Sequence, residues 1–89
     1  MRAIVTVVGK DRVGINADVC THLSDWKINI LDISQTVMQG NFAMTMLVDM
    51  EKCEMPFQEV SEKLRLRGEE MKLSIRMQRE DIFEAMHRI

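Results

Sequence analysis

Residues 28–50, INILDISQTVMQGNFAMTMLVDM, decide the fold class of this 89-residue chain. Apolar and polar side chains alternate through the segment, as in β-strands with one buried face. Gly40-Asn41 interrupts the alternation with two residues that tolerate the positive φ of a tight hairpin turn. The segment therefore predicts two antiparallel strands: the first is half-buried, and the second carries apolar side chains at Phe42, Met44, Met46, Val48 and Met50.

The flanking segments complete a β-α-β-β-α-β order. Residues 2–8 are apolar on both alternating faces, as in a central strand. Residues 13–26 and 57–68 carry apolar side chains at helical spacing. Pro56 is placed to begin the second helix, and Gly68 marks its end or a late irregularity. Alternation returns over residues 71–77, which indicates an edge strand. The order predicts a ferredoxin-like α+β sandwich, with an antiparallel sheet in the order 4-1-3-2 and both helices on one face.

The last residues, DIFEAMHRI, predict a short C-terminal helix at about 81–88 that docks on the domain. Asp81 is placed as its N-cap.

Two helices leave one face of the sheet open, and the apolar part of that face needs a cover, either this tail or a second copy. No linker or repeat divides residues 1–89, which we expect to form a single domain and, because the chain is short, a homodimer. The apolar stripe of the tail helix consists of Ile82, Phe83, Met86 and Ile89.

Composition and charge argue against several classes of protein. Twelve Lys and Arg against fourteen Asp and Glu leave a net charge of −2, so the chain lacks the basic surface of a nucleic-acid-binding protein. Its apolar runs are far shorter than the roughly 20 residues of a membrane-spanning helix, and we expect no membrane association and a cytoplasmic location. Cys20 and Cys53 form no CxxC pair and are expected to be reduced structural thiols.

No residue pattern predicts catalysis, a metal site or a cofactor. His22 and His87 fit neither a catalytic triad nor an HExxH motif and are expected on polar faces. The acidic pairs at 69–70 and 80–81 are expected to be solvated. The first loop lacks the paired cysteines of metal chaperones, and the first strand lacks the aromatic residues that stack RNA bases. We therefore expect no enzymatic activity.

The sequence GKDRVGIN at residues 9–16 is the best candidate for a ligand site. Gly9 and Gly14 would let a ligand approach the backbone, and the first N–H groups of the helix that follows favour a carboxylate or phosphate. Lys10 and Arg12 add positive charge. The alternative is an ordinary strand-to-helix turn, in which the glycines ease the turn, the aspartate caps the helix and the cations are solvated. The residues alone leave both interpretations open.

The segments GKDRVGI, NILDISQTVMQG and MTMLVD together resemble the ACT domain family, and most closely its small stand-alone members related to the glycine-cleavage regulatory protein. The likeness covers essentially the whole chain. In that family the fold pairs into dimers, and small ligands, usually amino acids, bind where the loop after the first strand of one copy meets the second strand of another. The resemblance implies a site formed by Asp11, Arg12, Val13, Gly14, Ile15 and Asn16 of one copy with Asn29, Ile30 and Leu31 of the other.

The resemblance also implies a function. It implies a homodimeric regulatory protein that binds a small molecule without a cofactor. Because the ligands of the family are usually amino acids, we expect an amino acid here. Most ACT domains regulate an attached enzyme, whereas this chain carries none, so any regulated protein would be reached in trans. Two alternatives stay open: a ligand-free dimerisation or interaction module and, more remotely, a small acylphosphatase-like enzyme, although the first loop lacks that family's phosphate-binding pattern.

Overall fold

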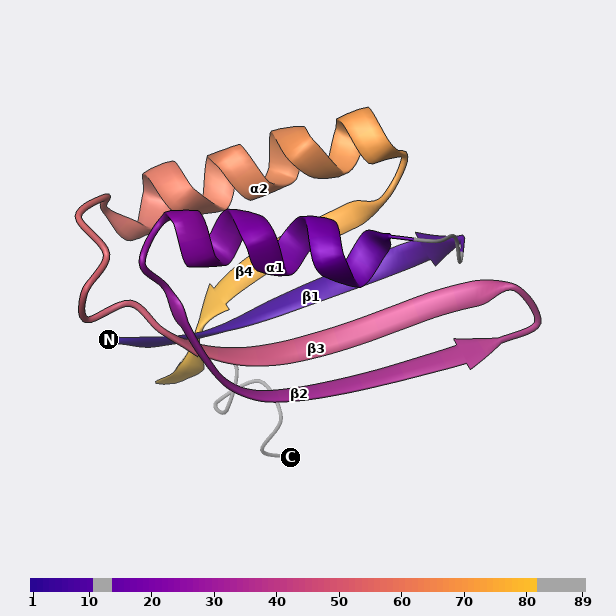
Figure 1. Cartoon of the computed structure of the whole chain (residues 1–89), viewed down its shortest axis with the longest axis horizontal. Coiled ribbons are helices and arrows are strands. Elements are labelled where there is room, and N and C mark those ends of the chain that lie inside the picture. Colours follow the sequence, from indigo (N-terminus) through magenta and orange to yellow (C-terminus); the bar gives the residue numbers. More distant parts are fainter. Residues whose placement is uncertain (11–13, 82–89) are drawn as a thin grey trace.

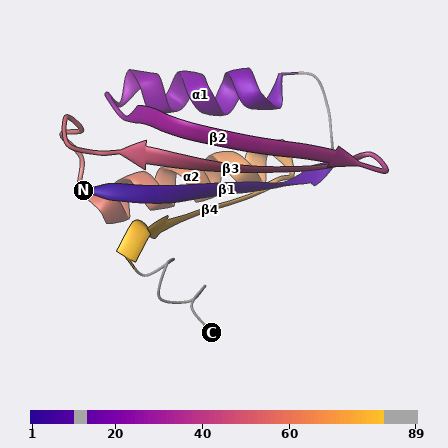
Figure 2. The ribbon, with the colours of Figure 1, turned by 90° about the horizontal axis from the view of Figure 1, so that it is seen from below.

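The computed structural model describes residues 1–10 and 14–81 of the chain. Four strands form one antiparallel sheet in the order β2-β3-β1-β4, and both helices lie on the same face of it (Figures 1 and 2). The predicted ferredoxin-like α+β fold and its strand order are therefore confirmed. The elements are β1 (Arg2–Lys10), α1 (Ile15–Asp25), β2 (Asn29–Met38), β3 (Asn41–Asp49), α2 (Phe57–Met71) and β4 (Ser74–Arg79).

The core lies between the helices and one face of the two central strands. Odd-numbered positions of β1 and even-numbered positions of β3 point to the helices and are buried, because antiparallel partners share a face. The predicted alternation of β3 is confirmed, and β1 is the central strand that its sequence predicted. The core side chains are Ala3, Val5 and Val7 of β1, Phe42, Met44, Met46 and Val48 of β3, Ile15, Val19 and Leu23 of α1, Val60, Leu64 and Met71 of α2, Ile75 and Met77 of β4, and Ile28, Met50 and Leu73 from the connecting segments.

Strand β2 is an exposed edge rather than the half-buried strand that its alternation predicted. Every residue of it is exposed except Ile30, which is half-buried. The strand has a partner only on its β3 side and lies at the margin of the layer that the helices cover, so its apolar side chains find no packing partners there. The register also shifts between Ile30 and Asp32, which leaves Leu31 in a β-bulge.

The turn between β2 and β3 lies one residue earlier than predicted. Gln39 (φ 51°) and Gly40 (φ 80°) take the positive φ values, and Asn41 already pairs with Met38 across the hairpin. Positive φ at both central residues is the requirement of a two-residue type I′ turn. Sequence alone favours asparagine over glutamine in this conformation, and the register of the two strands overrides that preference.

Gly68 lies inside α2 and does not end it. A Cβ atom at this position would lie 2.9 Å from the carbonyl oxygen of Leu73, so glycine is needed for the close approach to the start of β4. The helix ends at Met71, and Lys72 (φ 59°) closes it with a Schellman motif, in which the Leu73 N–H donates to the Gly68 carbonyl over 2.7 Å. The fourth strand consequently begins at Ser74, three residues later than predicted.

The C-terminal helix predicted at about 81–88 lies almost entirely outside the described residues. Helical backbone begins at Glu80, so Asp81 is already within a helical turn rather than capping it. Figure 1 shows this turn directly after β4.

Candidate functional site

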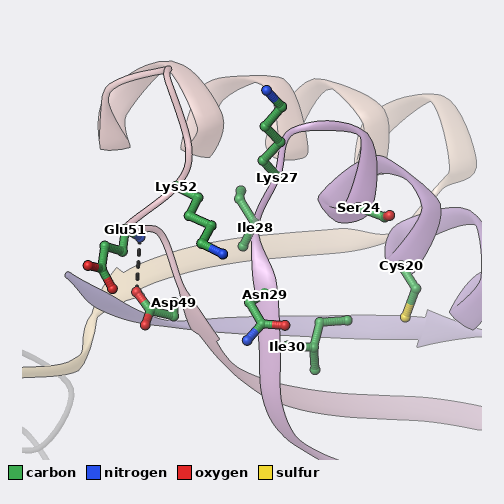
Figure 3. A pocket seen from close by; sticks show the side chains of 9 residues that line it. All are labelled: Cys20, Ser24, Lys27, Ile28, Asn29, Ile30, Asp49, Glu51 and Lys52. Atoms are coloured by element: carbon green, nitrogen blue, oxygen red, sulfur yellow. Dashed lines mark hydrogen bonds between the residues drawn. The ribbon is translucent and has the colours of Figure 1, made fainter.

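A cleft of about 560 Å³ opens between the C-terminal end of α1, the start of β2 and the end of β3 (Figure 3). It contains two of the residues to which the resemblance assigned a ligand, Asn29 and Ile30. The full lining is Cys20, Ser24, Lys27, Ile28, Asn29, Ile30, Asp49, Glu51 and Lys52.

The end of α1 fixes the position of Asn29. Lys27 adopts φ 60°, its N–H donates to the Ser24 carbonyl over 3.0 Å, and the Ile28 N–H donates to the Leu23 carbonyl over 2.9 Å. This pair of hydrogen bonds is a Schellman motif, which reverses the chain directly after the helix. Ile28 is buried under the turn, so the following residue, Asn29, starts β2 from an anchored point.

The cleft offers both signs of charge. Asp49 is half-buried, and its Oδ1 accepts the Glu51 N–H over 2.9 Å. Lys52 forms no ion pair with a described residue, and in Figure 3 its side chain extends toward the start of β2. Lys27 lies 3.9 Å from Glu54, with both side chains largely exposed. A cation and a carboxylate beside an amide side chain match a ligand that carries both an ammonium and a carboxylate group.

Sequence reasoning missed the charged part of this cleft. Asp49 ends β3, and Glu51 and Lys52 follow it, more than twenty positions after α1 ends. They reach the start of β2 only because β2 and β3 pair from Asn29 opposite Asp49. The signal that could have found them is the hairpin register, which puts the first residue of one strand opposite the last residue of the other.

The loop that was the best sequence candidate is described only in part. Asp11, Arg12 and Val13 lie outside the described residues. Gly14 is the N-cap of α1 with φ 93°, a left-handed conformation that favours glycine, and a Cβ atom there would meet nothing within 4 Å. Glycine therefore serves the backbone conformation, and the space in front of it is open.

The first turn of α1 presents backbone donors next to that space. The first bond within the helix runs from the Asp18 N–H to the Gly14 carbonyl over 2.9 Å, so the N–H groups of Ile15, Asn16 and Ala17 have no partner within the helix. The Ile15 side chain is buried in the core, so only its backbone could face a ligand. The Asn16 side chain is half-buried at the surface.

Gly9 serves packing. It belongs to β1, opposite Phe42, and a Cβ atom on it would lie 2.3 Å from Cδ2 of Leu73. The backbone of β1 thus approaches Leu73 too closely for any larger residue unless the leucine moves. This contact accounts for Gly9 without a ligand.

One copy of the chain does not bring the two halves of the expected site together. Gly14 precedes α1 and Asn29 follows it, and a helix of 11 residues is about 16 Å long at about 1.5 Å per residue. Figure 1 shows the two ends of α1 at opposite ends of the sheet. Asn29 and Leu31 are exposed, Leu31 at the bulge of β2.

Asn16 connects the start of α1 to β2. Its Nδ2 donates to Oε1 of Gln35 over 3.0 Å, and its Oδ1 accepts a hydrogen bond from the Cys20 thiol over 3.0 Å. Burial raises the pKa of the Cys20 thiol, which keeps it protonated as a donor. Neither Cys20 nor Gln35 was predicted to take part, although the spacing of four residues places Cys20 on the same helix face as Asn16.

The polar side of α1 binds α2. Asp18 accepts two hydrogen bonds from the guanidinium of Arg67, and the imidazole Nε2 of His22 lies 3.2 Å from Oδ1 of Asp18. The His22 ring also stacks on Trp26 with 5.6 Å between centroids. His22 thus contacts its own helix and the C-cap of that helix, and Asp18 connects it to Arg67 of α2.

Within residues 1–10 and 14–81, none of the helices combines the length and the hydropathy needed to cross a bilayer. The same residues contain no group of three His, Cys, Asp or Glu side chains placed to hold a metal ion.

Comparisons with known proteins agree with one another. A sequence profile of the ACT domain matches residues 2–78. A UPF0237 protein of Listeria innocua is 48% identical over 89 residues, 100% of both chains. The structure of an ACT domain protein from Streptococcus pneumoniae has a TM-score of 0.83 at 37% identity and covers 94% of each chain. A structure named for a glycine cleavage system transcriptional repressor has a TM-score of 0.74 at 26% identity, over 86% of this chain and 44% of its own.

Proposed function

The chain belongs to the ACT domain family, and from this premise we propose that it is a regulatory protein that binds a small amino acid as a homodimer. Membership of the family indicates regulatory binding of small molecules and no catalysis. The observation that carries the choice of ligand is the cleft at the start of β2, where Lys52, Asp49 and Asn29 line one space. An ammonium group next to Asp49 and a carboxylate next to Lys52 would each form a charge-assisted hydrogen bond.

The exposed edge of β2 supports pairing with a second copy. β2 is ten residues long and contains a single charged residue, Asp32. By contrast, the opposite edge strand, β4, has six residues and carries Arg76 and Arg79, charges of the kind that discourage edge pairing. The exposed apolar side chains along β2 are Leu31, Ile33, Val37 and Met38.

Antiparallel pairing of two β2 strands would complete the site. Asn16 contacts Gln35, in the C-terminal half of β2, and the antiparallel neighbours of that half belong to the N-terminal half of the partner strand. The start of α1 in one copy would then approach the cleft beside Asn29 in the other. The backbone N–H groups at Ile15 and Asn16 would add donors for the ligand's carboxylate. In this arrangement the two halves that one copy keeps apart become one site.

The regulatory output would be passed to a protein bound in trans. A ligand held between two β2 strands would favour the paired state over the separate copies, since it contacts both. The regulated protein would bind differently to the paired state and to the separate copies.

Thermal unfolding with each of the twenty amino acids tests the proposal. A ligand present at 100 times its Kd stabilises the folded state by about 2.7 kcal/mol, which is measurable as a higher Tm. We expect a shift with a small subset of amino acids. Asn29→Ala should remove it, because a lost hydrogen bond to a charged group costs about 1.5–3 kcal/mol. Lys52→Ala should weaken the shift, and Lys63→Ala, on the exposed side of α2, is its control.

The alternative function is a ligand-free dimerisation module, which the exposed apolar edge of β2 supports without any reference to the cleft. A dimer whose Tm does not change with any amino acid would favour that alternative and contradict the ligand proposal.

A further inference from the structure

A second groove, of about 480 Å³, lies between α2 and β4, at the edge of the sheet opposite β2. One wall is a stripe of α2 at helical spacing, formed by Ser61, Arg65 and Glu69. The other wall consists of residues 73–78, which are Leu73 and most of β4. This groove shares no lining residue with the cleft of the proposed ligand site.

The groove follows the free edge of β4. β1 pairs with the other edge, and no further strand pairs with β4 in residues 1–10 and 14–81. Residues of both faces can line one space only along an unpaired edge. They do so here, with Ile75 and Met77 from the face that the helices cover and Arg76 and Gln78 from the open face.

Backbone groups along this edge are available to an added strand. Alternate residues of an antiparallel strand direct both the N–H and the C=O to the same side, so half of the residues of β4 direct theirs away from β1. An edge with unpaired N–H and C=O groups is a template for another extended chain. The stripe of α2 would lie beside that chain, because it forms the opposite wall of the groove.

The two faces of β4 differ in chemistry. Ile75 and Met77 are 3% and 7% exposed and form an apolar floor on the side of the helices. Arg76 is exposed on the open face. Each of the other arginines in residues 1–10 and 14–81 pairs with a carboxylate, whereas Arg76 pairs with none in that part of the chain.

The α2 wall adds no free positive charge to the groove. Nη1 of Arg65 donates to Oε1 of Glu69 over 2.7 Å, and the same guanidinium also pairs with Glu62. Two carboxylates therefore compensate this cation. The uncompensated positive charge beside the groove belongs to Arg76.

We propose that β4 accepts an extended segment of the regulated protein as an added strand, with apolar side chains toward the groove and acidic side chains toward Arg76. Successive side chains of a strand point to opposite faces, so apolar and acidic residues would alternate along that segment. Main-chain hydrogen bonds supply the affinity in this mode of recognition, and the alternate side chains supply the specificity. An acidic residue opposite Arg76 would form a favourable cross-strand pair.

The same charge argues against a second copy as the occupant. Two β4 strands would bring Arg76 and Arg79 of both copies into one short ladder, and like charges on neighbouring strands are destabilising. The arginines that discourage self-pairing thus favour an acidic segment of another protein.

This inference rests on the proposed function only for the nature of the partner, a protein bound in trans. Pairing of two β2 strands would leave one β4 at each outer edge of the joined sheet, so the ligand and the partner would bind at separate places. Peptide binding without any amino acid present therefore tests the β4 edge alone. The thermal shifts with amino acids test the ligand site alone.

Chemical-shift titration of the isotope-labelled full-length protein tests the surface directly. The probe is a short peptide in which Val and Glu alternate. We expect shift changes at the amides of residues 73–78 and of the α2 stripe, without comparable changes at residues 29–38. Changes confined to residues 29–38, or no changes at all, would overturn the proposal. Shifts of residues 73–78 that depend on protein concentration without peptide would overturn it in favour of a second copy.

Charge reversal at Arg76 tests the choice of an acidic partner. Arg76→Glu should lower the affinity for the Val and Glu peptide about tenfold and raise the affinity for a Val and Lys peptide by a similar factor. Lys63→Glu is the matched control, since it makes the same change in net charge at an exposed position of α2 outside the groove. This control should keep the wild-type preference. Equal effects of the two variants would mean that net charge alone attracts the peptide, which contradicts the proposal.

N-methylated peptides test strand pairing. In an extended peptide of alternating Val and Glu, the Glu N–H groups point to one edge and the Val N–H groups to the other. We compare a peptide N-methylated at every Glu with one N-methylated at every Val. One of the two should lose binding and the other should keep it. Binding by both, or by neither, would contradict addition of the peptide as a strand.

Discussion

Asn16 at the start of α1 donates a hydrogen bond from Nδ2 to Oε1 of Gln35 in the edge strand β2, over 3.0 Å. This bond joins the two surfaces that the proposed site needs: the first turn of a helix, whose first N–H groups have no partner within the helix, and the strand expected to pair with a second copy. Oδ1 of the same amide accepts from Cys20, so the orientation of Asn16 is fixed from both sides.

We expect Gln35→Ala to weaken ligand binding while the protein stays folded. Loss of one neutral hydrogen bond costs about 0.5–1.5 kcal/mol, which corresponds to a decrease in affinity of about two- to tenfold. Ser34→Ala, on the opposite face of the same exposed strand, is the control. Calorimetric titration with the amino acid found by thermal shift measures the affinity of both variants. Equal affinity of Gln35→Ala and the wild type would mean that this hydrogen bond does not contribute to ligand binding.

Gly14 and Gly40 provide a matched pair for the role of the first loop. Both have positive φ, 93° and 80°, and a Cβ atom on either would meet nothing within 4 Å. Gly14→Val and Gly40→Val should therefore lose similar stability, about 1–2 kcal/mol each for a left-handed residue with a side chain. Only Gly14→Val should abolish ligand binding, because a branched side chain there fills the space in front of the first helical N–H groups. If calorimetry finds full binding by Gly14→Val, the first loop is an ordinary turn and not part of the ligand site.

The sequence was sufficient for the order and type of the elements because their periodicities are strong. The alternation of β3 places every second residue in the core, and the two-sided apolarity of β1 matches a strand with neighbours on both sides. Such patterns reflect burial on one or both faces, and burial follows from the layer arrangement of the fold. Strand order followed once the element order was known.

The sequence was not sufficient to predict features that depend on contacts between distant segments of the chain. Apolar residues alternate along β2 from Ile33 on, as they do along β3, yet those of β2 face solvent. Periodicity shows which residues share a face and does not show whether that face is covered. The same limit applies to the cleft. Asn29 and Lys52 come together through strand pairing, so only the register of the hairpin, and no motif within one segment, indicates that proximity.

Gly68 shows this limit within a helix, and it gives a stability prediction. A methyl group at this position would lie 2.9 Å from the Leu73 carbonyl oxygen and 3.0 Å from Cγ1 of Ile75. Gly68→Ala should therefore destabilise the fold by about 1–3 kcal/mol, the usual cost of overpacking, although alanine is the better helix former. Urea denaturation measures the change. An unchanged or higher midpoint would mean that β4 can move away from α2 at little cost.

A charge on the edge of β2 should prevent dimerisation. Ile33 is 42% exposed on β2 and Leu66 is 45% exposed on α2, so Ile33→Lys and Leu66→Lys introduce the same charge at equally exposed positions. We expect Ile33→Lys to sediment as the 10.4 kDa monomer at micromolar concentration and Leu66→Lys to remain dimeric, as the wild type should. A dimeric Ile33→Lys protein would exclude β2 as the interface.

Cys20 should make the stability of the fold depend on alkaline pH. Burial raises the pKa of its thiol above the ordinary value of 9.0, so the unfolded chain releases this proton at a lower pH than the folded chain does. The folded state then binds more protons than the unfolded state above pH 9, and the free energy of unfolding falls as pH rises. The stabilisation that the protonated thiol contributes is complete below pH 9.0 and is lost as pH rises through the pKa of the folded thiol.

Urea titrations between pH 7.5 and 10.5 should therefore show a steeper decline in the free energy of unfolding for the wild type than for Cys20→Ser. The serine hydroxyl can still donate to Asn16 but does not titrate in this range. Cys53→Ser, which replaces the other half-buried free thiol, is the control and should keep the decline of the wild type. If Cys20→Ser and the wild type decline in parallel, the thiol is as accessible to water in the folded protein as in the unfolded chain, and its hydrogen bond to Asn16 does not depend on burial.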